Sequence, residues 1–299
     1  MKKTFKLLLL LKSTACALCL MTDGADAQVY TAPTDGVIAS YPMDGNADDF
    51  SSNQVNGVAI GGITPTTDRF GNVSGALAFN GIDQTIAPPD QNFPRAIENF
   101  SISLWVNPTG LEPLGSESVS GTSYSHAYAI AGVYGGNDSG ISIAVGTNGV
   151  AVLEHGDRFL PVVLSYAFPI TDWTMVTITV SNNGAPNLYI NGSLVRTGLS
   201  SGRVKIASVF AGDDYQGIGG GGYGRYAGSI DDLLLYNRTL SSTEVTDLYN
   251  AQRVEYEVTL TLKSSTNMKD WTPVLTNIVE TQNPQEFYKN DISVRIKAP

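Results

Sequence analysis

The sequence has almost no cysteine, few basic residues and no long apolar run after its first segment, and each shortage excludes a class of protein. Both cysteines, Cys16 and Cys19, lie near the N-terminus, so the rest of the chain has neither disulfides nor thiol chemistry. The 18 basic and 28 acidic residues give a formal charge of −10, which argues against nucleic acid and anionic membranes as partners. The later apolar runs have the length of strands, so we expect no membrane span in the mature chain.

The first residues have the three-part pattern of a secretory signal. Three lysines within residues 2–6 precede an apolar stretch, and Ala25-Asp26-Ala27 supplies the small residues that a signal peptidase reads. A transmembrane anchor is the alternative, but Lys12 interrupts the apolar stretch and the stretch is short. We therefore predict cleavage after Ala27 and a secreted protein, either extracellular or periplasmic.

The residues after the signal favour strands. Short runs rich in Val, Ile and Thr, such as Ile102–Val106 and Ile141–Val145, are separated by clusters of Gly, Asn, Asp and Pro. In Met175–Val180, apolar and threonine residues alternate, as on a half-buried strand. Asn183-Gly184 and Asn191-Gly192 indicate hairpin tips. Many short strands with little helix predict a sandwich or barrel, and the absence of a helix between strands argues against a parallel α/β fold.

Two further segments differ from this strand pattern. Ser241 and Glu244 have the spacing of a capping box, which predicts one short helix that starts after Ser241. From about Gln252 the composition changes, and Val254–Leu262 alternates strictly, as a strand with one wet face does. We interpret this tail as a small separate β-rich module.

Four segments, taken in chain order, resemble the laminin G-like (concanavalin A-like) jelly-roll domains of secreted bacterial proteins. They are Val37–Asp49, Gly75–Gly81, Phe100–Val106 (with Trp173 and Leu188–Gly192 after it) and Gly228–Ser241. The resemblance implies an all-β fold, an antiparallel two-sheet jelly-roll sandwich whose first and last strands are neighbours. We expect a signal peptide at 1–27, a linker at 28–36, the laminin G-like domain at 37–251 and the small β-rich module at 252–299.

Acidic residues follow the predicted opening strand and lie on the strand that we expect beside it. The resemblance implies a calcium ion near this edge, and Ca²⁺ prefers carboxylate and carbonyl oxygens from such loops. We expect Asp44, Asp49 and Asp231 to hold a structural Ca²⁺. The alternative is that Asp44-Gly45 and the residues around Asp49 are ordinary turn chemistry.

Tyrosines gather in two glycine-rich stretches. Tyrosine rings combine an apolar face with a polar tip, which suits stacking on sugars, although alternate tyrosines can equally pack in the core. The predicted ligand-binding residues are Tyr124, His126, Tyr128, Tyr215, Tyr223 and Tyr226. The run Gly217–Gly222 is not followed by a helix, so we interpret it as a loop and not as a phosphate cradle.

No catalytic motif is recognisable along the chain. Glu154-His155-Gly156-Asp157 is the densest cluster of catalytic residue types, but the convergence that a triad needs is not visible in a sequence. The spacing of zinc ligands is also absent. We therefore predict a non-catalytic binding or adhesion protein for a carbohydrate or cell-surface ligand, with calcium support. A glycoside hydrolase or polysaccharide lyase with an unrecognised site, and a structural surface protein, are the alternatives.

Overall fold

The computed structural model describes residues 31–89, 92–210 and 217–253 in full, together with the backbone of four strands nearer the chain ends. The chain divides into two units, which we describe separately. One unit comprises Thr34–Thr246, and the other combines Met1–Pro33 with Asp247–Pro299.

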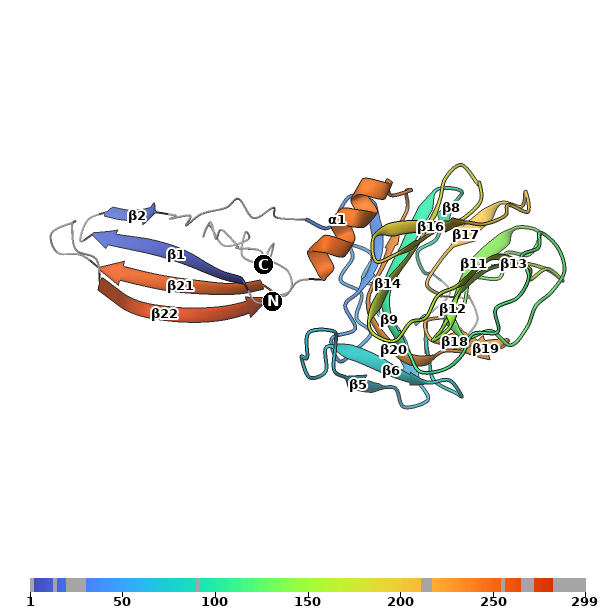
Figure 1. The fold of residues 1–299 in the computed structure, drawn as a ribbon, viewed down its shortest axis with the longest axis horizontal. Helices are drawn as coiled ribbons and strands as arrows, with labels where there is room; N and C mark the ends of the chain where they lie inside the picture. The colour runs from blue at the N-terminus through green and yellow to red at the C-terminus, as the bar shows by residue number, and fades with distance from the viewer. Residues whose placement is uncertain are drawn as a thin grey trace. The chain divides into compact units, whose positions relative to one another are not determined.

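The unit Thr34–Thr246 is built almost entirely of strands (Figure 1). Their bounds are β3 (Val37–Tyr41), β4 (Val58–Ile60), β5 (Thr64–Thr66), β6 (Ala76–Asn80), β7 (Thr85–Ala87), β8 (Ala96–Ile97), β9 (Phe100–Pro108), β10 (Tyr128–Ile130), β11 (Ser139–Gly146), β12 (Gly149–His155), β13 (Val162–Ala167), β14 (Thr174–Val180), β15 (Asn187–Ile190), β16 (Ser193–Thr197), β17 (Lys205–Ala207), β18 (Gly220–Gly221), β19 (Gly224–Arg225) and β20 (Ala227–Tyr236).

Two large sheets form the unit, and the all-β jelly-roll sandwich is confirmed. One sheet has the order β16-β15-β14-β9-β20-β6-β5, with β3 also beside β20, and the other has the order β13-β12-β11-β17-β8, with β10 beside β11. Buried apolar side chains from both sheets form one continuous cluster, which includes Ile102 and Ile178 from the first sheet and Ile143 and Val152 from the second. Burial of this cluster is the main driving force for the fold.

The central strand β14 is more buried than its sequence pattern indicates. The alternation of apolar residues and threonine predicts one wet face, but all seven residues of β14 are buried. The strand lies between β9 and β15, and Ser103 Oγ and Thr177 Oγ1 form a hydrogen bond of 2.8 Å across the β9–β14 pair. The half-buried interpretation is wrong here because the polar face is covered and the Thr177 hydroxyl has a hydrogen-bond partner in Ser103.

The first and last strands of the sandwich are neighbours, as predicted. β20 pairs with β6 over Ala227–Ile230 and with β3 over Leu233–Tyr236. The register of β20 shifts between Asp231 and Leu234, and Asp232 has a φ of 42°. This bulge presents two adjacent carboxylates at the point where the strand changes partner.

The predicted helix is present as α1 (Ser242–Gln252). Its capping box is complete, because Glu244 N donates to Ser241 Oγ at 3.2 Å and Ser241 N donates to Glu244 Oε2 at 2.8 Å. Among the described residues, no helix is long and apolar enough to cross a membrane.

The second unit contains a four-stranded sheet of order β2-β1-β21-β22. Its strands are β1 (Lys3–Lys12), β2 (Ala15–Cys19), β21 (Tyr256–Ser264) and β22 (Thr272–Thr281), and β1 pairs with β21 in parallel. The predicted cleavage site after Ala27 lies outside the described residues, so cleavage there stays a prediction.

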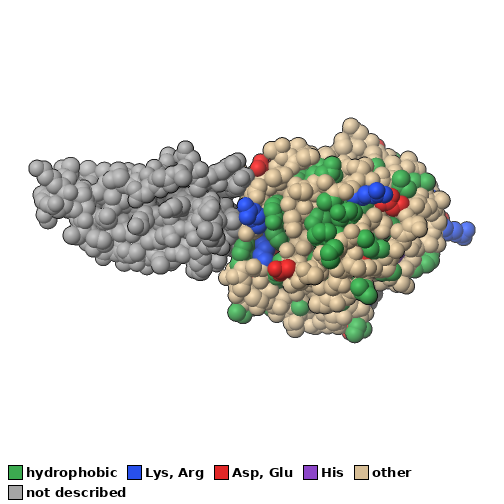
Figure 2. All heavy atoms as spheres, viewed as in Figure 1, with side chains coloured by type: hydrophobic (Ala, Val, Ile, Leu, Met, Phe, Trp, Pro, Cys, Tyr) green, Lys and Arg blue, Asp and Glu red, His purple; other side chains and the backbone are tan. Residues whose placement is uncertain are grey.

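Figure 2 shows one face of the molecule, on which hydrophobic side chains form several small groups and the charged side chains are few and scattered. Apolar atoms contribute much of the surface of most folded proteins, so such groups are ordinary.

Candidate functional site

The long polar segment at residues 111–125, which we call the insertion, is held against the edge of the second sheet. Ser118 N donates to Val162 O at 2.8 Å, and Ser123 N donates to Leu160 O at 2.8 Å. In return, Leu160 N donates to Gly121 O at 2.9 Å. These bonds give the insertion a defined path beside β13, and they place Tyr124 at the surface.

The glycine run, which we expected to be a loop, supplies β18, and β18 forms a short hairpin with β19 just after the run. Gly224, with a φ of 145°, lies against the backbone of His126. A Cβ at Gly224 would be only 1.9 Å from His126 O. Ser125 N also donates to Tyr223 O at 2.8 Å. Only glycine permits this approach of two backbones, and it places Tyr223 beside the insertion.

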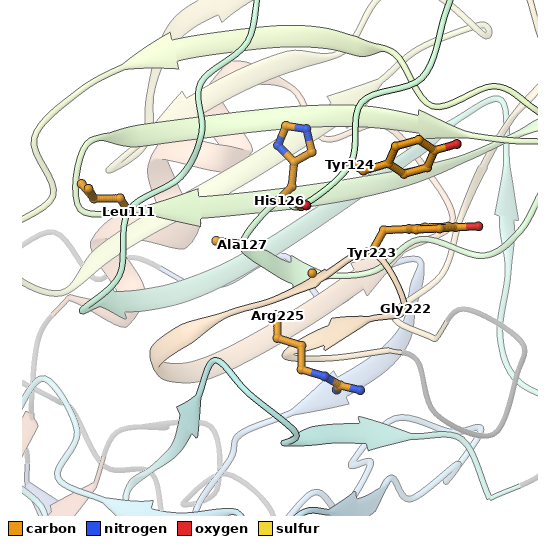
Figure 3. A pocket seen from close by; sticks show the side chains of 9 residues that line it. Leu111, Tyr124, His126, Ala127, Gly222, Tyr223 and Arg225 are labelled. Carbon is orange, nitrogen blue, oxygen red and sulfur yellow. The ribbon is translucent and has the colours of Figure 1, made fainter.

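A pocket of about 390 Å³ lies between the insertion and this hairpin (Figure 3). Figure 3 shows the Tyr124 and Tyr223 side chains extending in the same direction, with Leu111 toward the opposite end of the pocket. The lining residues are Leu111, Tyr124, Ser125, His126, Ala127, Gly222, Tyr223, Gly224 and Arg225. The volume falls within the range of small-molecule sites.

Four aromatic rings form a continuous series at this surface, which we call the aromatic array: Tyr124, Tyr223, His155 and Tyr134. The ring centroids of Tyr124 and Tyr223 are 5.0 Å apart, those of Tyr223 and His155 5.8 Å, and those of His155 and Tyr134 5.4 Å. The tyrosines are 53%, 46% and 53% exposed in the order Tyr124, Tyr223, Tyr134. Four separate segments of the chain therefore converge on one exposed aromatic surface.

One end of the aromatic array is polar. Partial burial and the adjacent Asp157 carboxylate raise the pKa of Tyr134, and Arg203 opposes this shift. Arg203 itself lies over the Phe159 ring at 3.8 Å and donates to Gly136 O at 3.3 Å. The phenol and the nearby carboxylate can together donate to and accept from sugar hydroxyls.

The other predicted ligand-binding residues have different surroundings. Tyr226 is fully buried and donates from its hydroxyl to Ser229 O at 3.0 Å, and Tyr128 is also buried. His126 is buried between Glu112, which contacts Nδ1, and Ser123, whose Oγ is 2.9 Å from Nε2. Tyr215 lies outside the described residues. Of the predicted set, the structure therefore brings Tyr124 and Tyr223 together as exposed rings.

The structure gives the Asp49 carboxylate a role in the turn after β3. The carboxylate accepts hydrogen bonds from Ser40 N at 2.9 Å, Ser51 N at 2.8 Å and Val55 N at 3.0 Å. The side chain is almost fully buried. Its oxygens thus satisfy backbone donors, which matches the alternative of turn chemistry.

The Asp231 carboxylate pairs with a cation from the chain. Arg69 contacts Asp231 Oδ2 through Nη1 and Asp232 Oδ2 through Nη2, the latter at 2.6 Å. Burial raises the pKa of Asp231, and so do Asp232, Asp68 and Asp44, while Arg69 opposes this shift. Among the described residues there is no group of three acidic, His or Cys side chains arranged to hold a metal. Because Asp49 and Asp231 already have partners within the chain, these contacts give no support to the predicted calcium site, which stays an untested prediction, and we derive no role for a metal from it.

Glu154 of the densest sequence cluster lies inside the sandwich. Its carboxylate is fully buried 3.6 Å from Lys205 Nζ, and Ser201 donates to it. Lys205 Nζ also donates to Asn183 O at 3.0 Å. A carboxylate enclosed in this way cannot reach a glycosidic bond, so the structure offers no support for Glu154 as part of a glycosidase pair.

Two members of the aromatic array were not among the predicted residues. Tyr134 belongs to the same glycine-rich stretch as Tyr124, but nothing in the sequence distinguishes it from the buried Tyr128. His155 ends β12, where the alternation of the strand turns it to the opposite side from Glu154. That alternation was the only available signal for its exposure.

Comparisons with known proteins agree with the observed architecture. The family model described as the concanavalin A-like lectin/glucanases superfamily matches residues 80–246. None of the curated proteins is significantly similar in sequence.

Many solved structures are similar to this chain, and two of them illustrate the likeness. One is domain 4 of AbnA, a GH43 extracellular arabinanase from Geobacillus stearothermophilus, in complex with arabinotriose. It is 24% identical, with a TM-score of 0.52, and the match covers 71% of this chain and 98% of that one. The receptor-binding domain of botulinum neurotoxin type G is 19% identical, with a TM-score of 0.52, over 74% of this chain and 56% of that one. At these identities the two structures support the fold alone.

Proposed function

Because the chain belongs to the concanavalin A-like lectin/glucanases superfamily, we propose that it binds carbohydrate through the aromatic array. The observation that carries this proposal is the series of Tyr124, Tyr223, His155 and Tyr134, whose rings lie 5.0 to 5.8 Å from their neighbours. The three tyrosines are about half exposed. A folded chain gains little stability from rings left in water, so an exposed continuous series is typical of a ligand surface.

The chemistry of this surface suits a saccharide. Sugar rings have apolar faces of C–H groups that pack on aromatic rings, and hydroxyl groups at their rims that need donors and acceptors. Tyr134 and Asp157 provide a hydroxyl and a carboxylate at one end of the array. The pocket beside Tyr124 and Tyr223 provides a cavity of about 390 Å³ at the other end.

The relatives are consistent with this proposal. The similar domain of the arabinanase was solved with arabinotriose, and the similar toxin domain is a receptor-binding domain. Both therefore use the same general architecture for recognition of an external ligand.

We also propose that the chain is exported, as its N-terminal pattern indicates. N-terminal sequencing of the protein recovered outside the cytoplasm tests this proposal.

A polysaccharide panel with matched variants tests the proposed binding. We expect Tyr223→Ala and Tyr124→Ala to weaken binding to the best glycan about tenfold each, because each removes one stacking face from the array. Phe50→Ala is the matched control, since Phe50 is 72% exposed and lies outside the array. Equal binding by all three variants and the parent would contradict the proposal.

The same panel separates the alternatives. Release of reducing ends or unsaturated products from a bound glycan would favour a glycoside hydrolase or lyase. If no glycan bound under any condition, the structural surface protein would be favoured instead.

A further inference from the structure

Three side chains beside the pocket are linked in the order of a nucleophile, a base and an orienting acid. Ser123 Oγ lies 2.9 Å from His126 Nε2, and His126 Nδ1 contacts Glu112 Oε1. A carboxylate at Nδ1 favours the tautomer with its proton on Nδ1, so Nε2 is left to accept a proton from the Ser123 hydroxyl. This is the arrangement that converts a serine into a nucleophile in unrelated folds.

The acid of this series is fixed in place. Glu112 Oε2 accepts a hydrogen bond from Ala127 N at 2.7 Å, which ties it to the residue after His126. The Asn148 side chain makes two hydrogen bonds to the Glu112 backbone. Glu112 N donates to Asn148 Oδ1 at 2.9 Å, and Asn148 Nδ2 donates to Glu112 O at 2.9 Å. The side chains of His126 and Glu112 are 1% and 0% exposed. A carboxylate held in this way keeps the imidazole in a single orientation.

The backbone between the serine and the histidine is strained. Ser125 has a φ of 69°, in the left-handed region that residues other than glycine rarely occupy. The strain is held by hydrogen bonds from Ser123 N to Leu160 O and from Ser125 N to Tyr223 O, both 2.8 Å. Such strain persists where the surrounding structure enforces it, and it is common at functional sites. Here it accompanies the short three-residue separation between Ser123 and His126.

A substrate can approach this series from the surface. Ser123 is half-buried, and Tyr124 beside it is exposed and lines the pocket together with Leu111, while the His126 side chain behind Ser123 is buried. The exposed apolar Leu111 side chain can contact the carbon atoms of an acyl group. The aromatic array extends from the same pocket, since Tyr124 and Tyr223 belong to both.

We propose that Ser123 is a nucleophile activated by His126 and oriented by Glu112, and that it hydrolyses carboxylic esters of small acyl groups on a saccharide. The saccharide part of this proposal rests on the proposed function, and the ester part does not. The proposal departs from the prediction of a non-catalytic protein, which followed from residue spacing along the chain.

The reaction consumes one water for each ester. The Ser123 hydroxyl gives its proton to His126 Nε2 while Oγ attacks the carbonyl carbon, and collapse of the adduct breaks the bond to the alcohol oxygen, which takes the proton from Nε2. Water then attacks the acyl-serine and gives a proton to Nε2. The acid leaves, Ser123 recovers the proton, and the net products are one alcohol and one carboxylic acid.

A fluorophosphonate probe on the full chain tests the nucleophile directly. We expect one covalent adduct, mapped to Ser123 by mass spectrometry, and hydrolysis of p-nitrophenyl acetate above the buffer rate. Ser123→Ala should lose both, and Glu112→Gln should lower the hydrolysis rate by about 10²–10⁴-fold because the histidine loses its orienting charge. Ser116→Ala is the control, an exposed serine of the same insertion, and it should keep both.

One outcome overturns the proposed nucleophile, and another overturns only the saccharide part of the proposal. Absence of an adduct at Ser123, with hydrolysis equal to that of Ser123→Ala, means that the three side chains only anchor the insertion. Labelling and hydrolysis without binding to any glycan mean that the ester part holds while the proposed carbohydrate site fails. A Ser123→Ala protein that still binds glycan shows that the two sites are separable.

Discussion

Two regions of the sandwich differ in how far their polar and aromatic side chains are buried and paired within the chain. Around the β20 bulge, Arg69 is buried, contacts both Asp231 and Asp232, and lies over the Trp105 ring at 4.5 Å. In the aromatic array, by contrast, Tyr124 and Tyr223 are left about half in water. The bulge satisfies its groups within the chain and therefore serves stability, whereas the array leaves interaction surface free for a ligand.

The largest test of this comparison is the removal of the central cation. Arg69→Ala leaves two carboxylates on the bulge without their counter-ion, and breaking a buried ion pair from one side costs about 3–5 kcal/mol. We expect a large drop in the unfolding free energy by chemical denaturation. Arg196→Ala is the control, because Arg196 pairs with Glu117 at the surface and such pairs contribute about 0–1 kcal/mol. Similar losses for both variants would remove the distinction between the regions.

The second test concerns the aromatic array, where we expect glycan binding to change and stability to stay nearly constant. Tyr134→Ala should weaken glycan binding about threefold to tenfold, since it removes one end of the array, and it should change the unfolding free energy by less than about 0.5 kcal/mol. Isothermal titration and thermal unfolding measure the two effects. A loss of stability with unchanged binding would assign Tyr134 to the framework instead.

For a buried tyrosine we expect the reverse result, a loss of stability with unchanged glycan binding. Tyr226→Phe removes the hydroxyl that donates to Ser229 O, and one net hydrogen bond contributes about 0.5–1.5 kcal/mol. Denaturant titration should detect this loss while the glycan affinity stays at the parent value. Weaker glycan binding by Tyr226→Phe would connect the core to the array.

The helix cap gives a pH-dependent test of moderate size. The Arg238 hydrogen bond, opposed by partial burial and helped by Ser241, lowers the pKa of Glu244 from 4.5 to about 2. A lowered folded-state pKa means that the stabilisation is complete above the unfolded value and is lost as pH falls from about 4.5 to about 2. Glu244→Gln should therefore flatten the stability curve in that window. A parallel curve for parent and variant would contradict this assignment.

Calcium should have the smallest effect. Because Arg69 already neutralises the Asp231 carboxylate and Asp49 binds backbone donors, we expect the same melting temperature with calcium and with a chelator. A calcium-dependent rise that disappears in the Asp44→Asn, Asp231→Asn double variant would restore the original metal prediction.

The fold was far more predictable from the sequence than the site. Alternation and turn dipeptides depend on local backbone geometry, so Met175–Val180 and Asn191-Gly192 were found in their predicted elements. Burial of a particular tyrosine depends on what packs over it, which is why Tyr124 and Tyr226 could not be told apart. The partner of Asp231 was equally invisible, because Arg69 is 162 residues away along the chain.

One glycine joins the features that we assign to recognition and to chemistry. Gly224 permits the hairpin backbone to touch the carbonyl of His126, so any larger residue must push the hairpin and the insertion apart. In a saturation mutagenesis screen, this position should tolerate no replacement for either activity while the sandwich core still folds. A single inherited change there would therefore silence both, and second-site revertants should be rare because no neighbouring side chain can be trimmed to make room for a clash with the main chain.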